Sequence, residues 1–315
     1  MLDVRRLRVL REVARCGSFS GAAATLGYTQ PAISRHVTLL EQETGATLLE
    51  RRSSGVRLTD AGELLVGHAD AILARLRDAE EDLDALLGLR SGKLRMSTLS
   101  SAAATIVPQA IVEFRDLLPD VELSVSMVEP PGVVPLLRGG EVDLALCNEA
   151  SHLELPDVEG MLLFEEPLLV ALPRDHRLAR ARRSRVRLGE LAEERWMLGT
   201  SRACPDAARF VRACHAEGFE PQIAFHHDDY AAVLGFVAAG VGAAPVPDMV
   251  ARNAPPDVRI CTMHGVTLTR PIVAVMPAGY QSRPARAMVE VLQQISAEWR
   301  AAGRAGVPVA PVRAA

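Results

Sequence analysis

The 315-residue sequence predicts three parts: a winged helix-turn-helix over residues 1–59, a long linker helix over residues 60–89, and a two-lobed α/β domain over residues 90–300. Three observations predict this fold class. Two short capped helices lead into an arginine-rich hairpin, a single long amphipathic stripe follows, and strands then alternate with helices. A chain of this length can bury a separate core in each compact part.

The first helix of the predicted helix-turn-helix motif spans Ser20–Leu26. Ser18 precedes it as an N-cap, and Gly27 follows at the position where a left-handed glycine ends a helix. Thr29 then caps a second helix, and Pro31 lies in the first turn, where its missing N–H leaves no hydrogen bond unmade. Two capped helices separated by so short a turn are typical of a helix-turn-helix.

The second helix has an apolar side and, near its N-terminus, a polar side. The apolar side, which we expect to be buried, consists of Ile33, Val37, Leu39 and Leu40. The polar side consists of Gln30, Ser34, Arg35 and Thr38. A recognition helix presents its N-terminal residues to base edges in the major groove. There Gln can pair with adenine and Arg with guanine, each through two hydrogen bonds, so the pattern indicates a DNA-reading helix.

An arginine-rich hairpin follows the second helix. A short strand is expected to run from Gly45 to Leu49, and the turn after it contains Ser53-Ser54-Gly55. Three arginines flank this turn, where they can contact a phosphate backbone: Arg51, Arg52 and Arg57. Residues 1–59 hold nine Arg against five Asp and Glu and carry +4; because the whole chain carries −4, the remainder carries −8. This asymmetry places the nucleic-acid surface at the N-terminus.

These N-terminal motifs resemble those of LysR-type transcriptional regulators. The matching segments are Ala22–Leu26, Thr29–Ser34, Leu39–Glu41, Gly45, Leu48, Arg51 and Val56–Gly62. The family usually has Phe in place of Leu49, which changes packing, and a second wing arginine in place of Ser54, which removes one phosphate contact. The alternative is a small helical domain whose arginines are merely solvated. It is disfavoured because caps, turn and wing agree in spacing.

The resemblance implies sequence-specific binding of double-stranded promoter DNA. The residues that we expect to contact the duplex, or to position those contacts, are Ser18, Thr29, Gln30, Pro31, Ser34, Arg35, Thr38, Arg51, Arg52 and Arg57. It also implies a homodimer or homotetramer that binds a two-fold symmetric site, and contact with RNA polymerase. No cofactor is expected, only a small-molecule effector whose identity the sequence does not indicate.

Composition describes a soluble globular protein, with 49% hydrophobic and 23% charged residues. No apolar run is long enough to span a bilayer, and no signal peptide is visible, so we expect no membrane partner. Five scattered cysteines without CxxC spacing favour free thiols in a cytoplasmic protein. Some LysR-type relatives sense oxidants, and Cys204 with Cys214 would be the candidates here; inert packing thiols are the favoured interpretation.

The linker helix carries one apolar stripe at steps of three and four. Its members are Ala61, Leu65, His68, Ile72, Leu76, Ala79, Leu83 and Leu86. Such a stripe between two domains must be buried, and pairing with the same helix of a second chain is one way to bury it. Packing on its own chain is the alternative. The family resemblance favours dimerisation through Leu65, Ile72, Leu76 and Leu83, with the helix ending at Gly88 and a hinge at Ser91-Gly92.

From Lys93 onward, strands and helices alternate. This order predicts a mostly parallel sheet. The expected elements are a strand at Leu94–Leu99, a helix at Ala102–Leu117, a strand at Val121–Val128, a short helix at Val133–Arg138 and a strand at Val142–Cys147. Strands at Phe164–Leu172 and Pro271–Met276 would cross between two lobes, lobe I comprising residues 93–163 and 267–300 and lobe II residues 164–266. A helix at Arg283–Arg300 closes the domain, and residues 301–315 are expected to be a disordered tail.

Two such lobes form a cleft at the carboxyl ends of the strands. This half of the chain resembles the effector-binding domain of LysR-type regulators, itself similar to periplasmic binding proteins, through Gly140–Leu146 and Val237–Pro247. Polar residues at the strand ends are the expected effector ligands: Ser100, Ser101, Glu129, Asn148, Thr200, Ser201, Arg202, His226 and His227. Hydroxyls and free N–H groups beside Arg202 favour a small carboxylate or another hydrogen-bonding molecule.

Other classes of protein find little support. His226, His227, Asp228 and Asp229 form the densest polar cluster, but adjacent histidines rarely bind one ion, so no metal site is expected. Walker A, GxGxxG, HExxH and GxSxG motifs are absent from the sequence, which argues against the common enzyme classes that they mark. A stand-alone solute-binding protein would not carry the basic N-terminal motif. The sequence therefore predicts an effector-controlled, DNA-binding transcriptional regulator rather than an enzyme.

Overall fold

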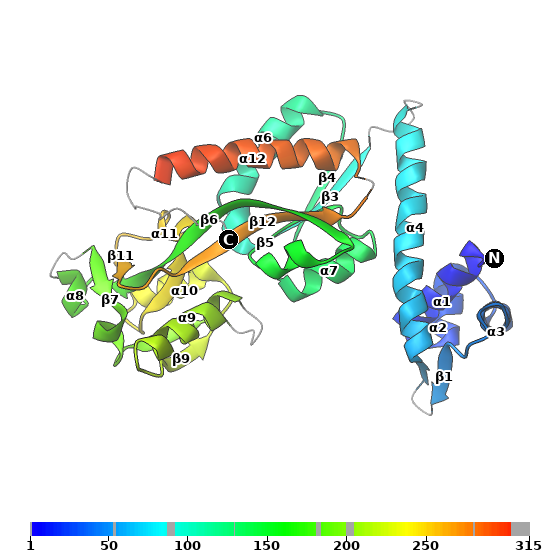
Figure 1. The fold of residues 1–315 in the computed structure, drawn as a ribbon, viewed down its shortest axis with the longest axis horizontal. Helices are drawn as coiled ribbons and strands as arrows, with labels where there is room; N and C mark the ends of the chain where they lie inside the picture. The colour runs from blue at the N-terminus through cyan, green and yellow to red at the C-terminus, as the bar shows by residue number, and fades with distance from the viewer. Residues whose placement is uncertain are drawn as a thin grey trace. The chain divides into compact units, whose positions relative to one another are not determined.

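The computed structural model describes residues 2–52, 55–86, 92–128, 130–180, 184–199, 205–279 and 281–303. The chain forms two compact units (Figure 1). The first comprises Met1–Gly92 and Pro135–Val142, and the second comprises Lys93–Val134 and Asp143–Ala315. Among the helices within the described ranges, none is both long and apolar enough to cross a membrane.

Three helices begin the first unit: α1 (Val4–Cys16), α2 (Phe19–Leu26) and α3 (Gln30–Thr44). The predicted N-caps of α2 and α3 are confirmed, since the side chains of Ser18 and Thr29 each accept a backbone N–H from the first turn. Gly27 ends α2 at a φ of 68°, as expected. Helix α1, which the sequence patterns above do not identify, is capped in the same way by Asp3.

The three helices share one apolar core. Its fully or almost fully buried members include Leu7, Leu10, Val13, Ala22, Ile33, Val37 and Leu40. Leu39, expected on the buried side of α3, is only half-buried. Burial of each large aliphatic side chain contributes about 1.5–3 kcal/mol relative to exposure. Because this core uses the apolar side of α3, the polar side at the start of the helix faces outward.

The hairpin after α3 consists of β1 (Leu49–Arg52) and β2 (Gly55–Leu58), paired antiparallel. The strand expected to lead up to Leu49 begins only at that residue. Gly55 has a φ of 129°, and a Cβ atom there would lie 2.7 Å from the carbonyl oxygen of Gly17. Val56 N donates to the same oxygen at 3.0 Å, which holds the wing against the turn after α1. Residues 53–54 lie outside the described part of the chain.

Helix α4 (Asp60–Leu86) is the long helix that the stripe predicted. Its first turns pack on the helix-turn-helix core through half-buried Leu65 and buried Ala69. Three stripe residues further along are exposed in the single chain: Ile72 by 38%, Leu76 by 44% and Leu83 by 57%. Within the same unit Ala74 is buried, and Arg77 donates to the carbonyl oxygens of Gly139 and Gly140. The stripe and this contact therefore use different residues of α4.

The second unit is built on an eight-stranded sheet in the order β4-β3-β5-β12-β6-β11-β7, with β10 also paired to β6. Its strands are β3 (Lys93–Thr98), β4 (Glu122–Met127), β5 (Leu144–Cys147), β6 (Val158–Pro173), β7 (Arg185–Arg187), β10 (Ala244–Pro247), β11 (Val258–His264) and β12 (Thr269–Pro277). The predicted parallel pairing of the first three strands is confirmed. Strands β6 and β12 run antiparallel along most of the unit and join its two lobes (Figure 1).

Eight helices accompany these strands, and α10, α11 and α12 contact β6 directly. They are α5 (Ser100–Ala103), α6 (Ile106–Leu117), α7 (Pro130–Arg138, whose residues from Pro135 onward belong to the first unit), α8 (Arg177–Arg180), α9 (Pro205–Ala216), α10 (Tyr230–Ala238), α11 (Asp248–Ala251) and α12 (Arg283–Gly303), with 3-10 turns at Ala150–Glu154 and Leu188–Leu191. A separate parallel pair, β8 (Arg195–Leu198) with β9 (Gln222–His226), belongs to lobe II. Helices α6 and α12 lie side by side over one end of the sheet (Figure 1).

Several boundaries differ from those expected. The helix predicted over Ala102–Leu117 is two helices, α5 and α6, separated by residues 104–105. Strand β6 begins at Val158 rather than Phe164, because its first half pairs with β12 inside lobe I. Helix α12 continues to Gly303, beyond the expected end at Arg300, and residues 304–315 of the predicted tail lie outside the described residues. Separate apolar cores fill the two lobes.

Candidate DNA-binding surface and effector cleft

The start of α3 presents polar side chains to solvent. Gln30, Pro31, Arg35 and Thr38 are exposed, and Ser34 is half-buried. Not all of these groups are free to read bases, because Thr38 Oγ1 donates to the carbonyl oxygen of Ser34 at 3.0 Å. The hydroxyls of Ser18 and Thr29 are engaged as helix caps. Gln30 and Arg35 therefore remain the side chains best suited to base edges, and the caps position the helix.

The wing adds positive charge beside this helix. Arg57 on β2 is exposed. Arg51 and Arg52 belong to β1, but their side chains lie outside what the structure describes. Tyr28, in the turn before α3, is also exposed, and its ring centroid lies 5.8 Å from that of His36.

A small cavity lies between the two lobes of the second unit, where β6 and β12 pass from one lobe to the other. Its lining includes Ser100, Ser101, Asn148, Asp206, His227, Asp228, Tyr230 and Arg270. Its volume is about 40 Å³. Because a water molecule needs about 10–15 Å³ measured in this way, the cavity admits only a few waters as it stands. A larger ligand requires the lobes to separate or side chains to move.

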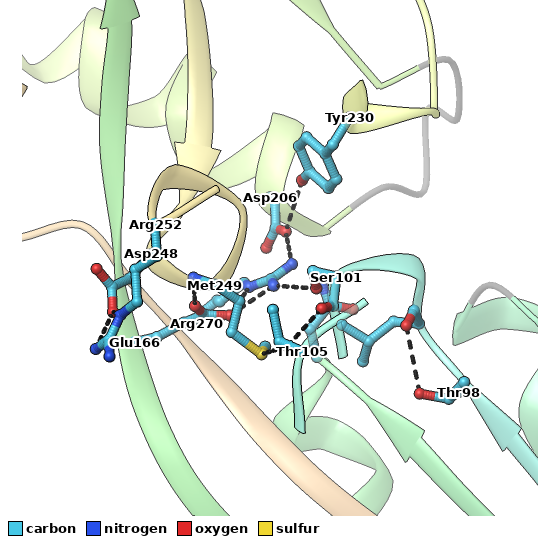
Figure 2. Close-up of polar contacts among 12 residues, drawn as sticks. Thr98, Ser101, Thr105, Glu166, Asp206, Tyr230, Asp248, Met249, Arg252 and Arg270 are labelled. Carbon is cyan, nitrogen blue, oxygen red and sulfur yellow. Dashed lines mark hydrogen bonds and ion pairs between the residues drawn. The ribbon is translucent and has the colours of Figure 1, made fainter. Parts of the chain in front are cut away.

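Arg270 is the centre of the polar network at this cavity (Figure 2). It is 1% exposed, and its Nε donates to Glu166 Oε1 at 2.7 Å. Its Nη1 donates to Asp206 Oδ2 at 2.7 Å, and its Nη2 donates to Ser101 Oγ at 2.6 Å. Arg270 lies on β12, Glu166 opposite it on β6, Asp206 on α9 and Ser101 on α5, so one guanidinium joins both lobes to the crossing strands.

Neighbouring groups complete the network. Arg209 Nη1 donates to Asp206 Oδ1 at 3.1 Å. The hydroxyl of Tyr230 lies 3.5 Å from Asp206 Oδ2 (Figure 2). Burial raises the pKa of Glu166, and the charge of Arg270 opposes that shift. Burial acts to lower the pKa of Arg270, but Glu166 and Asp206 outweigh it and raise that pKa. The guanidinium therefore stays charged and is held by two buried carboxylates.

The structure brings together only some of the predicted effector residues. Ser100, Ser101, Asn148 and His227 line the cavity. His226 does not belong to the lining; its Nδ1 lies 2.9 Å from the carbonyl oxygen of Gly199, and its side chain is exposed. Glu129, Thr200, Ser201 and Arg202 lie outside the described residues.

The sequence interpretation missed Glu166, Asp206, Tyr230 and Arg270, and it named Asp228 only as a member of the polar cluster at residues 226–229. Glu166 and Arg270 lie in or next to predicted crossing strands, where a charged residue inside an apolar run was a usable signal. In the part of the chain that is described, no three His, Cys, Asp or Glu side chains cluster in a way that could hold a metal ion.

The cysteines that are described do not form a reactive pair. Cys214 is buried, and burial raises its pKa to about 12. Cys147 is also buried, its pKa is raised to about 12 by burial, and its Sγ lies 3.3 Å from His152 Nδ1. Cys204, the other candidate for redox sensing, lies outside the described residues. Because only the thiolate reacts readily, these surroundings suppress reactivity at Cys147 and Cys214.

We therefore expect iodoacetamide at about pH 8 to leave Cys214 unmodified in the folded protein, because a thiol with a raised pKa stays protonated there. Mass spectrometry of tryptic peptides measures the labelling. Cys16, which is half-exposed, provides the internal comparison and should be labelled first. Equal labelling of Cys16 and Cys214 under native conditions would contradict this prediction, and unfolding in urea should equalise them.

Known proteins share both units. The family described as "Bacterial regulatory helix-turn-helix protein, lysR family" matches residues 4–63, and "LysR substrate binding domain" matches residues 87–297. The "Probable HTH-type transcriptional regulator LrrA" of Synechococcus elongatus is 30% identical over 96% of this chain and 100% of its own length. The HTH-type transcriptional regulator ShiR of Corynebacterium glutamicum is 31% identical over 90% of this chain and 96% of its own.

Solved structures have the same fold. A full-length OxyR variant from Pseudomonas aeruginosa is similar with a TM-score of 0.69 and 23% identity, covering 94% of this chain and 95% of that one. Full-length CbnR complexed with its target DNA is similar with a TM-score of 0.64 and 23% identity, covering 93% of this chain and all of that one. The chain belongs to the LysR family of transcriptional regulators: it is a DNA-binding regulator, not an enzyme, whose C-terminal domain binds a small-molecule effector.

Proposed function

We propose that this regulator reads promoter DNA with Gln30 and Arg35 at the start of α3, and that Arg51, Arg52 and Arg57 of the wing bind phosphates. The observation that supports the proposal most is the outward-facing polar start of α3, whose apolar side is used by the core. Ser18, Thr29, Pro31, Ser34 and Thr38 position the helix or contact the backbone. Domain boundaries near residues 59 and 89 fit this division of roles.

The effector site belongs to the cavity under Arg270. Ser100, Ser101, Asn148 and His227 line it, and Asp206, Asp228 and Tyr230 add polar groups from lobe II. Since Arg270 bonds Ser101 of one lobe and Asp206 of the other, a ligand at this point can change how the lobes pack. It regulates only if it binds two states of the protein with different affinity.

Self-association through α4 completes the proposal. Ile72, Leu76 and Leu83 are exposed apolar residues of one stripe, and a second copy of the helix would bury them. A homodimer, or a tetramer of two dimers, then presents two recognition helices to the half-sites of a symmetric operator. The regulator works in the cytoplasm and acts on transcription through RNA polymerase.

Replacing Arg35 with Ala is expected to weaken specific operator binding by about 1–3 kcal/mol, because a pair of hydrogen bonds to one base is lost. Replacing Arg57 with Ala should weaken binding to all duplexes alike. It should also reduce the slope of log affinity against log salt concentration by the amount that about one phosphate contact contributes. The operator is first selected from random duplexes. Fluorescence anisotropy across a range of salt concentrations then measures both variants.

Arg115→Ala, an exposed arginine on α6, serves as the matched control and should bind operator like the wild type. If Arg35→Ala and Arg57→Ala both retain wild-type affinity and salt dependence, α3 and the wing do not form the DNA-binding surface. Equal losses on operator and random duplex for Arg35→Ala would instead assign that residue to a phosphate, which contradicts its role in reading bases.

A further inference from the structure

The turn at Gly139–Glu141, which follows α7, packs on the linker helix α4. Its glycines are buried, and Arg77 Nη2 donates to the carbonyl oxygens of Gly139 at 2.8 Å and of Gly140 at 3.1 Å. A guanidinium suits carbonyl groups that the end of a helix leaves without partners. By its contacts this turn belongs to the first unit, although the chain on both sides of it, residues 93–134 and 143 onward, belongs to the second.

The approach of the turn to α4 depends on a glycine. Gly140 has a φ of 60°, and a Cβ atom there would lie 2.3 Å from Ala74 Cβ and 2.8 Å from Arg77 Nη2. Ala74 itself is buried. A side chain at residue 140 would therefore push the turn away from α4, whereas two small residues allow the contact and Arg77 fixes it.

The contact uses the side of α4 opposite the proposed dimer stripe. Ala74 lies two residues from both Ile72 and Leu76, which is about 200° around a helix. Asp70, one turn before Ala74, belongs to the same side: burial raises its pKa, and the nearby charge of Glu141 adds to that shift. A second copy of α4 and the Gly139–Glu141 turn can therefore pack on the helix at the same time.

The same turn leads directly into the sheet that ends at the effector cavity. Asp143 accepts hydrogen bonds from Arg95 Nε at 3.0 Å and Nη2 at 2.7 Å, and its backbone N donates to the carbonyl oxygen of Arg95, so this end of the turn is fixed to β3. Strand β5 follows, and Asn148 after it lines the cavity. The carbonyl oxygen of Asn148 accepts from Arg209 Nη2 at 3.2 Å, and Arg209 also binds Asp206.

We propose that the Gly139–Glu141 turn links the effector domain to the linker helix, with Arg77 as the positioning residue, so that the state of the cavity and the affinity for operator are coupled through β5. Two sites are coupled when one element that both of them influence has two arrangements. The turn fits this requirement because α4 fixes one end of it and β3 fixes the other. The inference rests on the proposed DNA-reading and effector sites and is independent of the chemical class of the effector.

A double-mutant cycle tests the coupling without an effector. Arg209→Met perturbs the cavity network from within the second unit. It should change operator affinity by about fivefold or more, which is the low end of typical couplings between sites. In an Arg77→Met background the same substitution should change affinity by less than about twofold, the range expected of independent sites. Fluorescence anisotropy on the selected operator measures all four proteins.

Two results would overturn the proposal: an effect of Arg209→Met that persists in full in the Arg77→Met background, or an Arg209→Met protein that binds operator like the wild type. Arg77→Lys keeps a cationic donor and should retain most of the coupling, which simple packing would not require. Circular dichroism confirms that each variant is folded before affinities are compared.

Glycine variants test the contact independently of Arg77. Gly140→Ala should also uncouple Arg209→Met from operator affinity, because the new methyl group meets Ala74. The matched control is Gly218→Ala, since Gly218 has a φ of 87° but open space around its Cβ position, so it measures backbone strain alone. Adding Ala74→Gly to Gly140→Ala removes the clashing atom and should restore part of the coupling. Equal behaviour of Gly140→Ala and Gly218→Ala would contradict the contact.

The coupling and the regulatory function fail separately. Operator binding by the wild-type protein tests DNA recognition by itself, and its absence contradicts the proposed function. Wild-type binding of operator together with an unchanged effect of Arg209→Met in the Arg77→Met and Gly140→Ala backgrounds contradicts only the role of the turn.

Discussion

Replacing Arg270 with Met is expected to lower the free energy of unfolding of the second unit by about 3–5 kcal/mol. The substitution keeps an apolar stem but leaves Glu166 and Asp206 buried without their shared cation. Both tryptophans of the chain, Trp196 and Trp299, belong to this unit, so urea unfolding followed by tryptophan fluorescence measures the change directly.

Two further variants make the result specific. Arg174→Met removes an arginine whose ion pair with Asp257 is exposed on both sides, and it should leave the stability of the unit nearly unchanged. The triple variant Arg270→Met, Glu166→Leu, Asp206→Leu should recover part of the loss, because the three most deeply buried charges are removed together. Recovery is incomplete because Arg209 loses its partner Asp206 and Met249 N loses its acceptor on Glu166. Wild-type stability in Arg270→Met alone would show that the network does not hold the lobes together.

Replacing Ile72 with Asp is expected to weaken self-association by about 100-fold or more, because each chain would place an unpaired carboxylate in an apolar seam. Operator affinity should fall with it, since two half-sites are no longer held by one assembly. Light scattering over a dilution series measures association, and anisotropy on the selected operator measures DNA binding.

Ala71→Asp provides the control for charge on the same helix. Ala71 is exposed and adjacent to Ile72, but it points about 100° away around the helix and is not part of the stripe. It should associate and bind operator like the wild type. If Ile72→Asp assembles normally at low concentration, the stripe of Leu65, Ile72, Leu76 and Leu83 is not the dimer seam. The proposal that α4 mediates self-association then fails, and so does the proposal that this assembly holds the two half-sites together.

Local patterns by themselves determined the helix-turn-helix. Ser18, Gly27 and Thr29 act through hydrogen bonds and backbone angles within four residues, so their roles are visible in the sequence. The apolar spacing of α4 and the strand–helix alternation of the second unit are equally local, and both elements exist as predicted. Boundaries were less well determined. The segment predicted as one helix over Ala102–Leu117 is two helices in the structure. The sequence did not reveal this break, because nothing in its composition marks residues 104–105.

Only the tertiary structure decided the character of the effector cleft. Glu166 and Arg270 are 104 residues apart in sequence, and Arg270 and Ser101 are 169 apart. No local pattern reports such contacts, because they depend on how β6 and β12 pair and how α5 and α9 meet them. Ser101 therefore looked like a ligand for a carboxylate, whereas in the fold it accepts a hydrogen bond from an arginine that two acidic residues of the protein already neutralise.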